Sequence, residues 1–191
     1  MNFHYLEFEV QLLDVPHRPW RRFELRHTFS FEELHGAIQM ACGWQFCHLY
    51  EFRDGSDRAI ARTSRFDDID DEDEAPSADE VPLRRHFKRA GQEVYYVYDF
   101  RDNWRHRVRF LGNTTDPQRW VQRLTSGEGV FPPEDCGGPP GFERCVRASL
   151  MTEAELRRLD PMAREEMLDL REWLGDWRPD GFDLMGSKQS F

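Results

Sequence analysis

Polar side chains around one predicted hairpin turn form the set best suited to chemistry. The strands EVYYVYDF and WRHRVRF are separated only by the turn RDN, so side chains on both sides of the turn can approach one another. The strand HLYEF adds candidates if it lies beside this hairpin. The set consists of His48, Glu51, Asp99, Asp102, Trp104 and His106. Two histidines with two or three carboxylates suffice to hold a divalent metal ion and to activate water for hydrolysis.

A second interpretation of these residues stays open, because their spacing matches no established metal motif such as HExxH. In this alternative, Asp102 and Asn103 cap the turn. His106 is then a histidine at the edge of the core whose hydrogen bonding is satisfied. The sequence therefore assigns no metal ligand by itself, although a divalent ion is the cofactor that this set would bind.

The segment FPPEDCGGPPGF, residues 131–142, is the most unusual string of the chain. Glu134 and Asp135 could bind a cation or act as a base, which would make them secondary contributors to the same site. Prolines restrict φ and glycines supply positive φ, so the segment also fits a rigid corner that begins a helix. Cys136 has no basic neighbour in sequence that would favour its thiolate. We favour the rigid corner.

Three arginines raise the question of nucleic acid. Alternation places Arg105, Arg107 and Arg109 on one face of a strand, and the basic string RRHFKR precedes it with aromatic residues nearby. Single-strand binding proteins combine positive charge with aromatic side chains in this way. The net charge of −10 argues against phosphate binding. The alternative is a solvated strand face whose arginines pair with nearby acids.

The acidity of the chain is concentrated in one segment. Residues 67–80 hold nine acids and neither lysine nor arginine, which leaves 26 basic and 27 acidic side chains elsewhere in the 191 residues. Such dense like charge predicts an acidic disordered loop. One hypothesis is that this loop folds over the arginine face and competes with nucleic acid there.

The sequence predicts a cytoplasmic protein with no membrane span. It contains no run of about 18 apolar residues, and the start MNFHYLEFEV lacks the features of a signal peptide. The four cysteines form no CxxC pair, and reduced thiols are the expectation for a chain of this kind. They are Cys42, Cys47, Cys136 and Cys145.

The elements that would position the candidate residues begin with two strands and a helix. Apolar residues alternate with polar ones from residue 6 to 12, and RRFELRH predicts a second strand. Ser30 with Glu33 is a capping box for a helix that ends at Gly43. HLYEFR and residues 59–63 then predict two further strands. This ββαββ order is typical of a β-grasp-like α+β unit with a mixed sheet.

The remainder of the chain predicts the second hairpin and then helices. Thr152 with Glu155 forms another capping box, and Asp160 followed by Pro161 begins a helix that Gly175 ends. We expect one domain over residues 1–191. The hairpin would extend the sheet or pack on it, and a C-terminal helical part, residues 141–175, would cover one face.

Several strings in order resemble one known family over nearly the whole chain, from Phe8 to Leu184. They are PWRRFEL, VYDFRDNWRHRV and PPEDCGGPPGF, supported by HLYEF and EWLGDWRPDGFDL. The chain resembles the plasmid open-reading-frame-three-like proteins of a root-inducing plasmid, a family also labelled as the TnpR-type passenger of an insertion element. The resemblance implies a genetic neighbourhood rather than a reaction.

Two departures from the family pattern concern the candidate site. The resemblance implies glycine where Arg101 stands, and a positive φ there would strain an arginine by about 1 kcal/mol unless the turn type has changed. It also implies cysteines at Phe131 and near Leu124. Because these cysteines are absent, we do not expect a thiolate-rich metal site in this loop.

Two functional hypotheses follow. The first is a binding or accessory protein of the mobile-element-associated type, with nucleic acid as a candidate partner and no catalysis of its own. The second is a metal-dependent hydrolase acting on nucleic acid or another phosphate ester through His48, Asp99, Asp102 and His106. The absence of any recognised catalytic motif favours the first.

Overall fold

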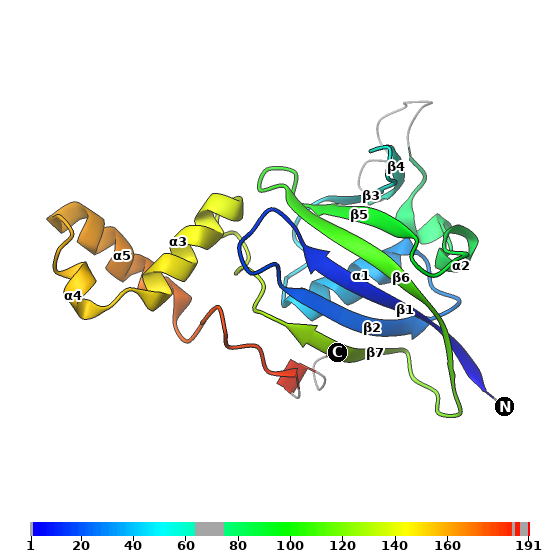
Figure 1. Ribbon diagram of the computed structural model, residues 1–191. Helices are drawn as coiled ribbons and strands as arrows, with labels where there is room; N and C mark the ends of the chain where they lie inside the picture. Colours follow the sequence, from blue (N-terminus) through cyan, green and yellow to red (C-terminus); the bar gives the residue numbers. More distant parts are fainter. Residues whose placement is uncertain (1, 64–74, 185, 188–190) are drawn as a thin grey trace.

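The computed structural model describes residues 2–63, 75–184, 186–187 and 191 (Figure 1). Within these residues, seven strands form one sheet in the order β4-β3-β5-β6-β1-β2-β7. The strands are β1 (Phe3–Leu12), β2 (Trp20–Arg26), β3 (Tyr50–Arg53), β4 (Ala59–Arg62), β5 (Glu93–Tyr98), β6 (Trp104–Asp116) and β7 (Gln122–Glu128). The helices are α1 (Phe31–Cys42), α2 (Leu83–His86), α3 (Gly138–Leu150), α4 (Glu153–Leu156) and α5 (Pro161–Leu174), with a short 3-10 helix, η2 (Ala78–Glu80).

Helix α1 packs on one face of the sheet and encloses the core. The capping box predicted at Ser30 and Glu33 is present, and Gly43 ends the helix in the left-handed conformation with φ of 78°. The core between α1 and the sheet is rich in aromatic rings. Its fully buried members include Phe8, Phe23, Phe31, Phe52, Tyr96 and Phe110. All of these except Phe31, which begins α1, come from alternate positions of their strands, as the sequence pattern predicts.

The α+β class and the ββαββ element order are confirmed, but the expected mixed sheet is wrong. Every pairing between the described strands is antiparallel. The reason is that the second hairpin does not extend an edge. It sits between β3 and β1, with β5 pairing to β3 and β6 pairing to β1.

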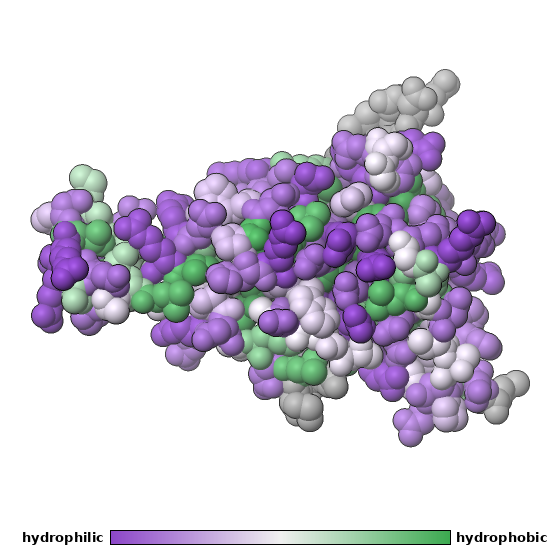
Figure 2. Space-filling model, in the orientation of Figure 1, coloured by the Kyte–Doolittle hydropathy of each residue, from purple (hydrophilic) through white to green (hydrophobic). Residues whose placement is uncertain are grey.

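The C-terminal helices do not cover the sheet, contrary to the expectation for residues 141–175. Helices α3, α4 and α5 extend away from one end of the sheet (Figure 1). They bury a small core of their own, formed by Cys145, Ala148, Leu156, Met167 and Leu174. The physical reason is that α1 already covers the apolar face, while the opposite face carries charged side chains. In the view of Figure 2 the surface is accordingly mostly hydrophilic.

The acidic segment is folded where the structure describes it. Residues 67–74 lie outside the described residues. Ser77 forms a parallel bridge with Arg62, and Ala78 in η2 is fully buried. The prediction of a disordered loop over residues 67–80 is therefore wrong for residues 75–80, because Ala78 packs into the main core and η2 lies against α1.

Candidate metal centre

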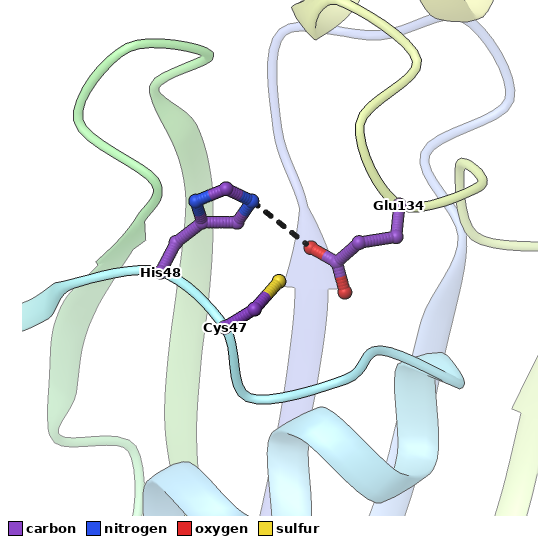
Figure 3. Close-up of side chains that lie close together, drawn as sticks. All are labelled: Cys47, His48 and Glu134. Atoms are coloured by element: carbon purple, nitrogen blue, oxygen red, sulfur yellow. Dashed lines mark ion pairs between the residues drawn. The ribbon is translucent and has the colours of Figure 1, made fainter.

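Three segments that are distant in sequence meet around the imidazole of His48. They are the loop between α1 and β3, the turn between β5 and β6, and residues 131–137 before α3. The Nε2 atom of His48 lies 2.8 Å from Asp135 Oδ1, 3.6 Å from Asp99 Oδ2 and 3.8 Å from Glu134 Oε1. Figure 3 shows the ion pair with Glu134 and the thiol of Cys47 beside it. Four of the candidate residues thus converge: His48, Asp99, Glu134 and Asp135.

Backbone N–H groups hold two of these carboxylates in place. Oδ1 of Asp99 accepts hydrogen bonds from the N–H groups of Arg101, at 3.0 Å, and Asp102, at 3.3 Å. Oε2 of Glu134 accepts one from the N–H of Gln45, at 2.7 Å. In both residues the other oxygen is the one nearest His48. Each carboxylate is therefore oriented by one oxygen and can offer the second to a ligand.

Cys47 is a site residue that the sequence analysis did not select. Its sulfur, the imidazole of His48 and a carboxylate oxygen of Glu134 all lie within 4.8 Å of one another. The N–H groups of Cys47 and His48 both donate to the hydroxyl of Tyr98, at 3.3 and 3.4 Å. Burial raises the pKa of that hydroxyl, so it stays neutral. The signal in the sequence was the adjacency of Cys47 to His48, which a search for CxxC spacing passes over.

The atoms around His48 have the spacing that a small metal ion needs. Zinc binds nitrogen and oxygen ligands at about 2.0–2.1 Å, so two ligands at a tetrahedral angle lie about 3.3 Å apart. The distances from His48 to its three carboxylates, 2.8 to 3.8 Å, bracket that value. Two ligand groups share the histidine: Cys47 with Glu134, and Asp99 with Asp135. Nitrogen, oxygen and sulfur together favour zinc over calcium or magnesium.

Glu51 and Trp104 lie outside this centre. The carboxylate of Glu51 pairs with the guanidinium of Arg53 at 2.5 Å, and both side chains line a hollow on the uncovered face of the sheet. Trp104 is buried in the core, where its ring packs against Trp44. Alternation along β3 explains why Glu51 does not join His48. His48 precedes the strand, whereas the side chain of Glu51 occupies one of its outward positions.

Asp102 is also outside the centre and has a structural role. Its Oδ2 accepts hydrogen bonds from the N–H groups of Gly137, at 3.2 Å, and Gly138, at 2.8 Å. These groups stand at the start of α3, so the carboxylate caps that helix from a distant turn and complements its dipole. The interpretation in which Asp102 caps its own turn was right that the carboxylate is a cap. It was wrong about the partner, which is the start of α3.

His106 is a core residue and contributes nothing to the centre. It is fully buried among the rings of Trp44, Tyr96 and Phe131. Neither ring nitrogen has a hydrogen-bond partner among the described residues, contrary to the expected satisfied histidine. Burial lowers the pKa of His106 to about 3, so the imidazole is neutral at physiological pH.

The arginine face is partly neutralised by neighbouring acids. Arg105 lies 3.8 Å from Asp14, while Arg107 and Arg109 each lie 3.9 Å from Glu93. This arrangement matches the second interpretation of the arginines, a solvated strand face with paired charges.

The backbone strain considered for Arg101 does not occur. The non-glycine residues with positive φ at the β5–β6 turn are Asp99 and Asn103, with φ of 52° and 54°. Arg101 is not among them.

Comparisons with known proteins agree with this fold. A family model described as plasmid pRiA4b ORF-3-like protein matches residues 4–186. The uncharacterized protein y4hQ of Sinorhizobium fredii is 32% identical over 158 residues, which cover 81% of this chain and 73% of that protein. The crystal structure of MM3350, a protein of unknown function from Methanosarcina mazei Go1, is 26% identical with a TM-score of 0.77 over 96% of each chain. Among the described helices, none has the length and apolar character to span a membrane.

Proposed function

This chain belongs to the plasmid pRiA4b ORF-3-like family. We propose that it is a metal-binding accessory protein of the mobile-element-associated type. Its ligand is a divalent transition-metal ion, with zinc as the best match. The observation that carries the proposal is the convergence of three carboxylate oxygens within 3.8 Å of one imidazole nitrogen, with a thiol beside them. His48 is the central ligand.

The charge of the cluster supports a cation rather than a self-contained ion pair. One imidazole can supply at most one positive charge against three carboxylates. The side chains of Asp99 and Glu134 are only 10% and 8% exposed, so water screens their negative charges poorly. A divalent ion bound beside His48 would offset the excess negative charge directly.

A second candidate function, hydrolysis, is favoured by the exposure of the centre. The side chain of Asp135 is 67% exposed and that of His48 is 30% exposed. A zinc ion held here would keep a coordination position toward solvent, as catalytic zinc sites do. The water in that position could attack a phosphate ester, in nucleic acid or in a smaller molecule.

Metal content tests the first proposal. We expect protein purified without chelator to contain about one equivalent of zinc, or to bind added zinc with micromolar or tighter affinity. His48→Ala should weaken zinc binding by roughly a hundredfold or more. The matched control is His4→Ala, which removes an exposed imidazole of β1. Equal zinc affinity in wild-type protein and His48→Ala would overturn the proposal, as would no zinc binding at all.

Turnover separates the two candidate functions. The zinc-loaded protein is incubated with bis(p-nitrophenyl) phosphate and with a labelled single-stranded oligonucleotide. Release of nitrophenol or cleavage of the oligonucleotide that disappears in His48→Ala would favour the hydrolase. Zinc binding without either reaction would favour the accessory protein, and retention of the intact oligonucleotide would identify nucleic acid as its partner.

A further inference from the structure

Arg21 is a buried cation that has no counter-ion among the described residues. It projects from β2 toward the core and is 4% exposed. Within the described part of the chain, the hydrogen-bond acceptors that Arg21 reaches are backbone carbonyls. Nε donates to Ala41 at 3.1 Å, and Nη1 donates to Trp20 at 2.9 Å, Glu128 at 3.1 Å and Gly129 at 2.9 Å.

The absence of a counter-ion is unusual for a buried charge. Burial lowers the pKa of Arg21 to about 10, which still leaves the guanidinium charged at neutral pH. Buried arginines are normally paired with a carboxylate or phosphate. The nearby thiol of Cys42 does not supply the charge, because burial raises its pKa far above neutrality. Nη2 of Arg21 donates to no acceptor among the described residues.

A cavity of about 420 Å³ opens beside this guanidinium. Its lining includes Arg21, Met40, Phe131, Phe182 and Asp183. The carbon Cζ of Arg21 lies 4.9 Å from the ring centroid of Phe131 and 3.5 Å from that of Phe182. The volume is within the range of small-molecule sites. Two charged side chains, Arg21 and Asp183, stand in the lining beside the apolar ones.

We propose that this cavity binds a small organic anion. The carboxylate or phosphate head of the ligand would accept from Nη2 of Arg21, and its apolar body would lie against Met40 and Phe131. The site is separate from the proposed metal centre, because none of the candidate metal ligands lines the cavity. Those candidates are Cys47, His48, Asp99, Glu134 and Asp135. It adds a second ligand class to the molecule.

Two neighbouring residues bear on the fit of an anion. Gly127 pairs with Arg21 across β2 and β7, and a Cβ atom there would come within 2.7 Å of Cδ of Arg21. The glycine therefore makes room for the arginine side chain. Asp183 lines the cavity, and its Oδ2 accepts from the N–H of Gly186 at 3.0 Å. Its negative charge opposes an anion, so Asp183→Asn should tighten anion binding.

Calorimetric titration of EDTA-treated protein tests the site, because the chelator removes metal that could bind the anion elsewhere. The probes are benzoate and phenyl phosphate, with benzamide as the neutral control. We expect one or both anions to bind at millimolar or lower concentration and benzamide to bind roughly tenfold more weakly. Arg21→Met should lose roughly tenfold in anion affinity, and Asp183→Asn should gain a few-fold. The preferred head group distinguishes carboxylate from phosphate ligands.

Three results would overturn the inference. They are binding of neither anion to the wild-type protein at about 10 mM, equal affinity for benzoate and benzamide, and unchanged anion affinity in Asp183→Asn. The last comparison decides the matter even if Arg21→Met does not fold, since Asp183 lies outside the core.

Discussion

The buried imidazole of His106 should make the protein lose stability in mild acid. Its pKa is lowered to about 3 in the folded protein by burial, against 6.5 for a free histidine. Below pH 6.5 the unfolded chain therefore binds a proton that the folded chain excludes. The stability contribution is complete above pH 6.5 and falls as the pH drops toward 3. At about 1.4 kcal/mol per pH unit, the loss between pH 8 and pH 5 is about 2 kcal/mol.

Urea unfolding at pH 8 and pH 5 measures this loss. The perturbation is His106→Phe, which keeps an aromatic ring between Trp44 and Phe131 and removes the titrating group. The free energy of unfolding of wild-type protein should fall between the two pH values by about 2 kcal/mol more than that of the variant. Any packing change caused by phenylalanine is present at both pH values and cancels in this difference.

A matched control separates titration from general destabilisation. Val108→Ala removes two methyl groups from a fully buried position of the same strand and should keep the wild-type pH dependence. His86, whose pKa burial also lowers, acts in the same direction in all three proteins. Equal losses of free energy in wild-type protein and His106→Phe between pH 8 and pH 5, within about 0.5 kcal/mol, would refute a buried histidine that resists protonation.

Two further predictions concern buried or capping hydrogen bonds. Asp102→Ala should destabilise the protein by about 1 kcal/mol and speed amide exchange in the first turn of α3, because the caps of Gly137 and Gly138 are lost. Unchanged exchange there would contradict the capping role. Tyr96→Phe should lower the free energy of unfolding, measured with urea, by about 1–3 kcal/mol. The reason is that the Tyr96 hydroxyl accepts a hydrogen bond from Nε2 of Gln39 at 3.0 Å in the core. A variant as stable as wild type would show that this bond contributes nothing.

The local elements were largely predictable because their signals are short in sequence. Ser30 with Glu33 and Thr152 with Glu155 form the capping boxes that their spacing predicts, and Asp160 caps α5. Alternation along β6 correctly placed Arg105, Arg107 and Arg109 on one face, since the residues that alternate with them, from Trp104 to Phe110, are buried. These features depend on neighbours within about four residues, so they do not require knowledge of the tertiary fold.

The candidate site was only partly predictable because it is built from three distant segments. The candidate residues read from the sequence included His48, Asp99, Glu134 and Asp135, which converge. They also included Asp102 and His106 as metal-site residues, and these two lie elsewhere. Alternation placed His106 on the strand face opposite Arg105 and Arg107 without showing that α1 covers that face. Once covered, an imidazole there is excluded from solvent and from every other candidate ligand.

The loop 131–137 shows where the sequence alone reached its limit. Its prolines and glycines correctly predicted a rigid corner that begins a helix, because they restrict the backbone wherever they stand. The corner brings the carboxylates of Glu134 and Asp135 to His48. That contact depends on the antiparallel insertion of β5 and β6 between β3 and β1. By itself the sequence determined caps, strand faces and the concentration of acid in one segment. The order of strands decided which side chains meet, because contacts between distant segments are set by packing that no local pattern encodes.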